Sequence, residues 1–353
     1  IEEGRTDGNW LLRQGPHSAA AWADAAIINP WTMYLMYGDK DILKKQYNSM
    51  KGWIDFMRVH AVDYIWNYKL QFGDWVALDA EEGSYFGATP NDLTCTAYYA
   101  YSTGLFVQMA KALGKEDVAA EYEELYHKIV KKFQETFFDA EGNMTAQTQT
   151  AHIVALYFQL TPEKYITKTV EGLKRLLDKE NGHLVTGFVG TPYFCHALSQ
   201  NHALKEAYDL LLKEDFPSWL YQVKKGATTI WEHWDSYTKE KGFGGQNAMN
   251  SFNHYSLGSV LSWLYHTGLG IQRDETKPGY QHILLKPQPG TLEFMKGSVD
   301  SPYGVISAGW ERKGDKIEYQ VTIPVNTTAT LFKNTEDPAD TVELGSGTYT
   351  FML

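Results

Sequence analysis

The 353-residue chain carries 32 Lys and Arg against 43 Asp and Glu, a formal net charge of −11, and its hydrophobic and charged fractions are 43% and 21%. This balance is typical of a globular protein and excludes a disordered or fibrous chain. The acidic charge repels phosphate backbones, so we expect no nucleic-acid partner. No apolar run approaches the roughly 20 residues that cross a bilayer, so we expect no membrane partner either.

Aromatic residues make up 14% of the chain, including 11 Trp and 23 Tyr. Sugars present flat C–H faces and polar edges, whereas Trp and Tyr rings offer an apolar face and one polar group, so this composition suits a carbohydrate-binding cleft. A large helical core filled with rings explains any single Trp equally well.

Cys95 and Cys195 lie in apolar segments, and we expect both to be buried free thiols.

After an extended lead-in at residues 1–21, the apolar spacing predicts a succession of helices. They cover residues 22–37, 42–60, 92–113, 115–138, 145–160, 161–179, 191–200, 203–213, 216–223 and 254–268. Thr161 and Thr191 each precede a proline, which predicts a threonine N-cap with proline at the first helical position. Long Gly-rich loops are expected at residues 72–90 and 226–253, and such loops in a compact helical domain are usually functional.

From residue 277 the helical period gives way to short alternating runs separated by Pro and Gly turns, which predicts an antiparallel β-sandwich. The expected strands are 283–285, 297–299, 304–310, 316–323, 327–332, 341–344 and 347–351. The preceding helix pairs fit a barrel of inner and outer helices or an α-solenoid, and the lack of a fixed repeat argues against the solenoid. We therefore expect a helical domain over residues 1–274 and a small β-sandwich domain over residues 275–353.

The chain contains no phosphate-binding Gly-rich loop, no Gly-x-Ser-x-Gly elbow and no His-Glu-x-x-His pair, so we expect neither a cofactor nor a metal. The remaining candidates for catalytic chemistry are carboxylates that lie near tryptophans in the sequence. These are Asp24 near Trp22, Asp74 beside Trp75, and Glu232 between Trp231 and Trp234. Glycoside hydrolysis needs two carboxyl groups on opposite sides of a sugar ring. An apolar neighbour raises the pKa of a carboxyl group, as a general acid requires.

Structural roles compete with these chemical ones. Asp24 is equally well explained as an N-cap or first-turn carboxylate, and Asp74 as a turn residue. Glu232 follows an apolar pair inside a Gly-flanked loop, where no comparable structural role is evident, so we interpret it as a chemical residue. A lone histidine such as His254, at the start of an apolar helix, is most often a cap.

Several short segments, spread over nearly the whole chain, carry a family resemblance. They are AWADAA (21–26), PW (30–31), YGD (37–39), GDW (73–75), GFVGTP (187–192), ATTIWE (227–232), SFNHY (251–255) and GSGTY (345–349). In this order they resemble glycoside hydrolase family 78, the α-L-rhamnosidases. The Thr-Thr-Ile-Trp-Glu and Asn-His-Tyr runs are the most specific of them.

The resemblance implies an (α/α)6 barrel of the six-hairpin type, followed by a C-terminal β-sandwich. It implies hydrolysis of terminal non-reducing α-L-rhamnose with inversion, by a carboxyl acid and a carboxylate base that activates water. The base falls on Glu232. The residues expected to bind the carbohydrate substrate are Trp22, Asp24, Asp74, Trp75, Trp231 and His254.

The chain departs from the family pattern at one point. The family's general acid lies in an acidic, Arg-containing motif ahead of the Trp22 segment, and the carboxylates there, Glu2, Glu3 and Asp7, do not match it. The resemblance therefore implies a C-terminal portion that lacks the first barrel helices and supplies the base half of the site. Alternatives are a non-catalytic carbohydrate-binding fragment or another (α/α)6 glycosidase with a different sugar specificity. We expect Trp22, Trp75, Glu232 and His254 to line one pocket.

Overall fold

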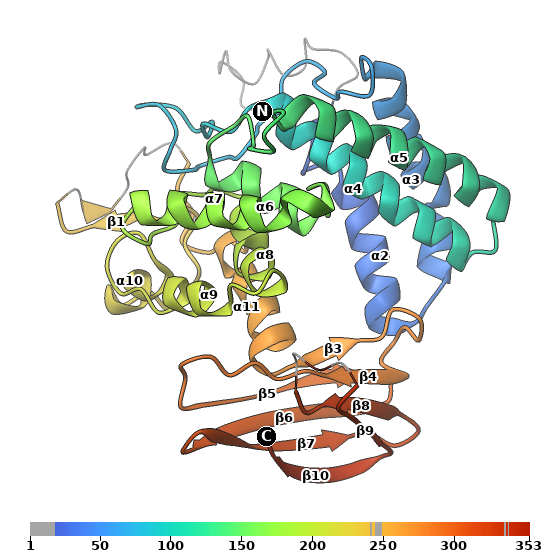
Figure 1. Ribbon diagram of the computed structural model, residues 1–353, viewed down its shortest axis with the longest axis vertical. Helices are drawn as coiled ribbons and strands as arrows, with labels where there is room; N and C mark the ends of the chain where they lie inside the picture. Colours follow the sequence, from blue (N-terminus) through green and yellow to red (C-terminus); the bar gives the residue numbers. More distant parts are fainter. Residues whose placement is uncertain (1–17, 241, 244–248, 335–336, 338) are drawn as a thin grey trace. The chain divides into compact units, whose positions relative to one another are not determined.

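The structure is a computed structural model that describes residues 18–240, 242–243, 249–334, 337 and 339–353. Its α-helices are α2 (Ala25–Tyr37), α3 (Asp41–His60), α4 (Asn91–Ala112), α5 (Glu116–Phe137), α6 (Gln149–Tyr157), α7 (Ile166–Lys179), α8 (Phe194–Gln200), α9 (Leu204–Leu211), α10 (Trp219–Lys224) and α11 (Val260–Trp263) (Figure 1). Short 3₁₀ turns are η1 (Glu163–Tyr165), η2 (Thr191–Tyr193) and η3 (Ser256–Ser259), and η4 (Leu264–Gly268) is a π-helix. None of the helices in these described ranges is both long enough and apolar enough to cross a membrane.

The chain forms two compact units, each assembled from separate stretches of sequence. Among the described residues, the first unit comprises 18–28, 46–176 and 185–190, and the second comprises 29–45, 177–184 and those from 191 onward. The first unit therefore holds α4, α5 and α6, and the second holds α8 to α11 and the strands.

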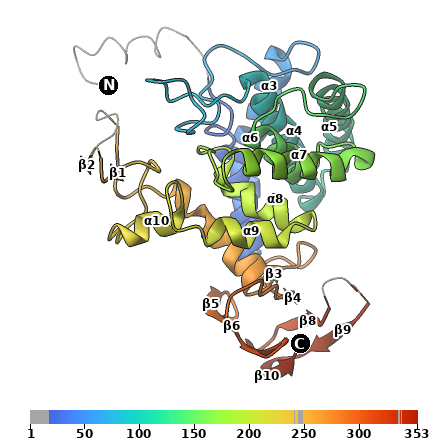
Figure 2. The same cartoon turned by 60° about the vertical axis from the view of Figure 1, so that its left-hand side comes forward.

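Helices α4 and α5 lie side by side as a hairpin within the first unit (Figure 2). Helix α4 is buried on nearly every face, as expected for an inner helix, whereas α5 buries one stripe and exposes the rest. Both helices lie within two residues of their predicted bounds. The free thiols of Cys95 and Cys195 are buried, which confirms that prediction.

Two helix starts use polar side chains as caps. Thr148 Oγ1 accepts the N–H of Ala151 at the start of α6, and Ser218 Oγ accepts the N–H of Tyr221 at the start of α10. The predicted cap at Thr161 is wrong, because Pro162 is the cap residue of η1 and the buried Thr161 hydroxyl has no hydrogen-bond partner. The proline shifts the start of the helical backbone by one residue and leaves the threonine outside it.

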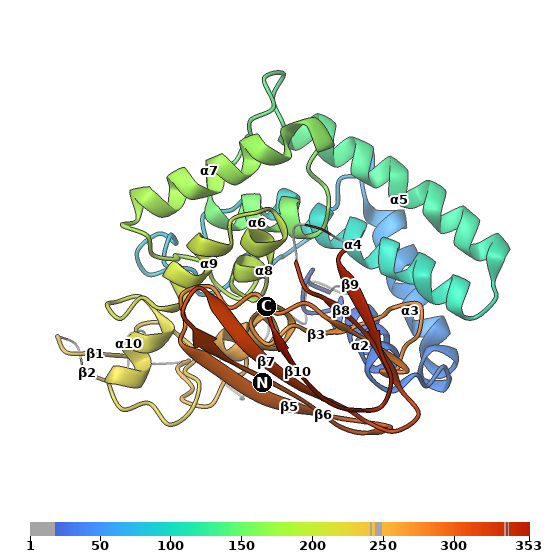
Figure 3. The same ribbon diagram turned by 60° about the horizontal axis from the view of Figure 1, so that its bottom comes forward.

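Eight strands of the second unit form two four-stranded sheets (Figure 3). One sheet has the order β10-β7-β6-β5 and the other β3-β4-β8-β9. The strands are β3 (Ile271–Arg273), β4 (His282–Leu285), β5 (Phe294–Ser301), β6 (Gly304–Lys313), β7 (Lys316–Ile323), β8 (Thr328–Phe332), β9 (Thr341–Leu344) and β10 (Gly347–Met352). Two more short strands, β1 (Tyr237–Thr238) and β2 (Gly242–Phe243), pair within the loop predicted over 226–253.

The sheets differ from the sequence prediction in two details. The first strand of the sandwich, β3, begins at Ile271 rather than after residue 277, because Ile271 pairs with Leu285 and joins the apolar core. Strands β4 and β8 pair in parallel, whereas every other described pairing is antiparallel. The chain between β4 and β8 forms β5, β6 and β7 of the other sheet before it returns, and alternation alone does not specify that crossover.

The inward-facing residues of these strands form one apolar core. Trp310 of β6 donates its Nε1–H to the carbonyl of Gly268, and Tyr319 of β7 donates its hydroxyl to the carbonyl of Leu269. These two buried aromatic side chains therefore attach the sheet to the end of η4, where the chain leaves its last helix.

Candidate active site

An aromatic row connects two of the predicted sugar-binding residues in the first unit. The ring of Trp22, which is 40% exposed, meets the edge of Phe72 at a centroid distance of 4.9 Å. Phe72 in turn lies 5.5 Å from Trp75, again edge to face. The structure therefore places Trp22 and Trp75 in one row, and such a row of partly exposed rings offers apolar faces to a sugar.

The carboxylate of Asp74 anchors the loop that carries Trp75. Asp74 is 1% exposed and accepts four hydrogen bonds, from the Thr150 hydroxyl at 2.5 Å and from the backbone N–H groups of Gly187, Val189 and Gly190 at 2.9, 2.7 and 3.1 Å. Burial raises the pKa of this carboxyl group, and the four donors oppose that rise. Asp74 thereby joins the GDW and GFVGTP segments, which lie far apart in the sequence.

The close approach of these two segments requires glycine. A Cβ at Gly187 would lie 2.1 Å from the carbonyl oxygen of Trp75 and 2.7 Å from the nitrogen of Ala77, so no larger residue fits there. The N–H of Phe188 also donates to the Trp75 carbonyl at 3.0 Å. Directly after Trp75, Val76 adopts φ +56°, which is a strained conformation for a β-branched residue. Strain of this kind concentrates at functional sites.

Asp24 is fully buried, and both of its oxygens accept hydrogen bonds. Its Oδ1 accepts from the Trp53 indole at 2.9 Å and from the Ser102 hydroxyl at 2.5 Å, and its Oδ2 accepts from the N–H of Ala21 at 2.8 Å. Burial raises the pKa of Asp24 to about 6, against the opposing effect of these donors. The side chain therefore holds the residues beside Trp22 against α3 and α4.

Glu232 lies in the second unit, where two segments of the long loop pair with each other. The backbone N–H of Glu232 donates to the carbonyl of Ser251 at 2.9 Å, and the N–H of Ser251 donates to Glu232 Oε2 at 2.7 Å. Glu232 is 6% exposed, and its Oε1 makes no hydrogen bond with the described residues. Both Asp24 and Asp74 have their two oxygens engaged, so Glu232 differs from them in keeping one oxygen for a further partner.

The same pairing of the two loop segments brings the backbone of His254 next to Ile230, close to Trp231 and Glu232. The N–H of His254 donates to the carbonyl of Ile230 at 2.9 Å, and His254 Nδ1 accepts the N–H of Ser256 at 3.2 Å. With Nδ1 as an acceptor of this bond, the imidazole carries its proton on Nε2. The Trp231 ring is 4% exposed and packs edge-on against Phe252 at 5.6 Å.

The structure thus gathers the predicted residues into two groups. Trp22, Asp24, Asp74 and Trp75 belong to the first unit, and Trp231, Glu232 and His254 to the second. A single pocket lined by both groups stays a prediction, and Glu2, Glu3 and Asp7 lie outside the described residues. Phe72 was not predicted as a site residue, although it directly precedes the Gly-Asp-Trp motif. Within the part of the chain that the structure describes, no cluster of three His, Cys, Asp or Glu could hold a metal ion.

Known proteins resemble this chain along almost its whole length. The family model of the bacterial alpha-L-rhamnosidase 6-hairpin glycosidase domain matches residues 7–267, and that of the bacterial alpha-L-rhamnosidase C-terminal domain matches residues 270–346. An alpha-L-rhamnosidase of Alteromonas sp. (strain LOR) is 37% identical over 318 residues, which are 88% of this chain and 34% of that protein.

Solved structures agree with this similarity. The crystal structure of Streptomyces avermitilis alpha-L-rhamnosidase complexed with L-rhamnose superimposes with a TM-score of 0.86 at 32% identity, over 95% of this chain and 33% of that one. The alpha-L-rhamnosidase of Aspergillus terreus gives a TM-score of 0.90 at 31% identity, over 96% of this chain and 39% of that one.

The helical architecture with its C-terminal β-domain is that of a six-hairpin glycosidase, which confirms the predicted fold class. The chain belongs to the bacterial α-L-rhamnosidases of glycoside hydrolase family 78, the family that its motifs resemble. It spans about a third of the length of the curated relatives that it matches.

Proposed function

We propose that this chain supplies the general-base half of an inverting glycosidase site that releases terminal α-L-rhamnose from rhamnosides. The observation that carries the proposal is the carboxylate of Glu232, which is almost fully buried, is held by the Ser251 N–H through Oε2, and keeps Oε1 without a hydrogen-bond partner among the described residues. A carboxylate oriented through one oxygen can take a proton through the other.

In the proposed step, Glu232 Oε1 takes a proton from a water molecule as that water's oxygen attacks the anomeric carbon of rhamnose. The bond from that carbon to the leaving oxygen breaks, and a general acid on the opposite side of the ring protonates this oxygen. In such sites the two carboxyl groups stand about 6.5–9.5 Å apart, which leaves room for the water. We propose that the acid comes from a segment ahead of Trp22, in keeping with the family pattern.

We propose that some of the remaining residues contact the sugar and that others hold those residues in place. Trp22 and Trp75 would provide apolar faces for the sugar, and His254 would contact the sugar from the Glu232 loop. Asp24 and Asp74 have both oxygens engaged within the protein, so we propose that they act as positioning residues for the two tryptophans. Trp231 would exclude bulk water from Glu232.

The test is Glu232→Gln in the complete protein, measured on an aryl α-L-rhamnoside. The variant keeps the shape of the side chain and loses the base, so kcat should fall by about 10²–10⁴-fold or more with KM little changed. Glu240→Gln changes an exposed carboxylate of the same loop and should leave kcat unchanged. Near-wild-type kcat with a raised KM in the Glu232 variant would remove that residue from the mechanism and indicate that it only orients hydroxyl groups of the substrate.

A further inference from the structure

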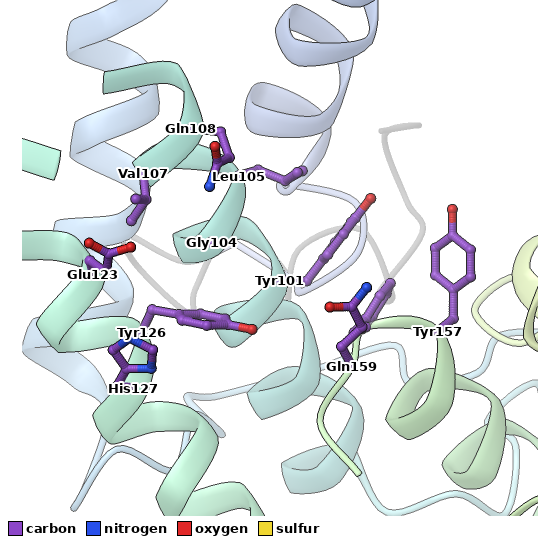
Figure 4. A pocket seen from close by; sticks show the side chains of 11 residues that line it. Tyr101, Gly104, Leu105, Val107, Gln108, Glu123, Tyr126, His127, Tyr157 and Gln159 are labelled. Atoms are coloured by element: carbon purple, nitrogen blue, oxygen red, sulfur yellow. The ribbon is translucent and has the colours of Figure 1, made fainter. Parts of the chain in front are cut away.

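A pocket lies in the first unit, among α4, α5 and the end of α6 (Figure 4). Its volume is about 250 Å³, which is just below the roughly 300 Å³ at which drug-sized pockets begin, so it suits a ligand of a single ring. None of Trp22, Trp75, Glu232 or His254 lines it. The pocket is therefore separate in its residues from the candidate active site.

Stacked and tilted aromatic rings form much of the lining. Tyr101 of α4 and Phe158, just after α6, are stacked at a centroid distance of 4.2 Å with planes only 8° apart. Tyr126 of α5 lies over Gly104, where a Cβ would come within 3.2 Å of the Tyr126 ring. Figure 4 shows Tyr126 pointing from α5 toward Tyr101 and Gln159. A rigid wall of this kind suits a ligand with an apolar face.

Polar groups at the rim of the pocket have no partners within the described protein. The side chains of Gln108, Tyr126, His127 and Gln159 make no hydrogen bond with any described residue. They offer two amides, a hydroxyl and an imidazole, which donate and accept in several directions. A ligand that presents several hydroxyl groups beside an apolar face would satisfy both the rings and these polar groups.

The charge of the lining restricts the ligand further. Glu123 is the only carboxylate that lines the pocket, and it forms a 2.9 Å ion pair with Lys111. No lysine or arginine lines the pocket, and the nearby Lys111 is already paired with Glu123, so the lining offers an anionic ligand no unpaired cation and presents the Glu123 carboxylate to it. An uncharged ligand meets neither difficulty.

We infer that this pocket is a non-catalytic binding site for a neutral sugar ring. The rings of Tyr101 and Tyr126 contact the apolar face of the sugar, and the amides of Gln108 and Gln159 bind its hydroxyl groups. This site goes beyond the proposed hydrolysis, because it depends neither on Glu232 nor on turnover.

The test follows the ¹³C-methyl NMR signals of Leu105, which lines the pocket, as L-rhamnose, D-galactose or D-glucuronate is added to the chain. The two neutral sugars should shift these signals saturably at concentrations up to about 0.1 M, as expected for millimolar affinity, and D-glucuronate should not. If neither neutral sugar shifts the Leu105 methyl signals, the pocket is not a sugar-binding site. An equal response to D-glucuronate would overturn the neutral class.

Two substitutions that the fold tolerates tie the signal to the pocket. Gln108→Ala places a good helix former at an exposed position of α4, and Gln159→Gly suits a residue whose φ is already +58°. Each should weaken sugar binding about threefold or more, since each removes hydrogen bonds to the ligand. Glu135→Ala, at an exposed position nearer the end of α5, should bind as the wild type does. Unchanged affinity in both pocket variants would contradict the assignment.

Discussion

The carboxylate of Asp74 accepts the backbone N–H of Val189 at 2.7 Å, although 115 residues separate the two in the sequence. Because this bond and its neighbours hold two loop segments together, the position of Trp75 depends on a buried, hydrogen-bonded carboxyl group as well as on apolar packing. Networks of this kind are costly to leave half satisfied.

Asp74→Asn should destabilise the protein by about 2–4 kcal/mol, because the amide nitrogen replaces one acceptor oxygen and meets donors on either side. At the Oδ1 position it faces the N–H groups of Val189 and Gly190, and at the Oδ2 position it faces the N–H of Gly187. Urea unfolding measures the change. Asp300→Asn, at an exposed position with no hydrogen bond to the described residues, should be neutral. Equal stability of the two variants would show that the network does not support the loop.

Gly187→Ala should destabilise the protein by about 2 kcal/mol or more, since its Cβ would clash with the backbone of Trp75 and Ala77. The matched change Gly52→Ala, in the exposed interior of α3 with no atom within 4 Å of the added Cβ, should stabilise it by about 0.5–1 kcal/mol. If Gly187 packs as closely against Trp75 as the structure shows, thermal unfolding should give a lower Tm for Gly187→Ala and a higher Tm for Gly52→Ala. A rise in Tm for both would contradict it.

Asp24 should make the stability depend on pH between about 4 and 7. Its pKa is raised from 3.8 to about 6 in the folded state, so the folded protein holds this proton more tightly than the unfolded chain does. The contribution of the protonated Asp24 to the free energy of unfolding is complete below the pKa of the unfolded state. It is lost as the pH rises through about 6, which lowers the free energy of unfolding by on the order of 3 kcal/mol. Asp24→Asn should remove this dependence.

The measurement for Asp24 is the free energy of unfolding of both proteins at several pH values. Asp74, whose pKa is also raised, is present in both, so the difference between the curves isolates Asp24. A difference that stays constant across this range would mean that burial does not raise the pKa of Asp24.

Phe72→Ala should raise KM for an aryl α-L-rhamnoside in the complete protein by about threefold to tenfold and leave kcat within about twofold, because the ring supports Trp22 and Trp75 without reaching the reacting atoms. Phe294→Ala removes an exposed ring from β5 and serves as the control. Loss of kcat without a change in KM would place Phe72 in the chemistry instead of in sugar binding.

The sequence predicted the parts of the fold that local patterns determine. Helix α5 lies within two residues of its predicted bounds because its apolar stripe is long and regular, and α4 does so because a run of small and aromatic residues ends at Gly114. The segment predicted as a loop over residues 72–90 contains no helix or strand, whereas the one over residues 226–253 contains the short pair β1 and β2. The parallel pairing of β4 with β8 was missed, since strands this far apart in the sequence meet through a topology that alternation does not encode.

The candidate site divides in the same way. The surroundings of Glu232 in the sequence indicate a chemical role, but the sequence does not separate such a role from ordinary helix capping for Asp24 or from a turn position for Asp74. Their partners, Ser102 and Val189, lie 78 and 115 residues away, and no local motif reveals such bonds. The sequence did not indicate Phe72, because its role comes from its position in space: its ring contacts both Trp22 and Trp75.

The division into two units has a consequence for dissecting the gene. From residue 28 to residue 191 the chain passes from one unit to the other five times, so no single cut yields either unit as a continuous fragment. An expression fragment that ends near residue 274 would keep α8 to α11 and lose the sheets that complete the same unit. Truncations of this protein should therefore aggregate or remain unfolded, whereas circular permutation through an exposed turn of the sheets, such as Lys313–Lys316, would keep every stretch of both units.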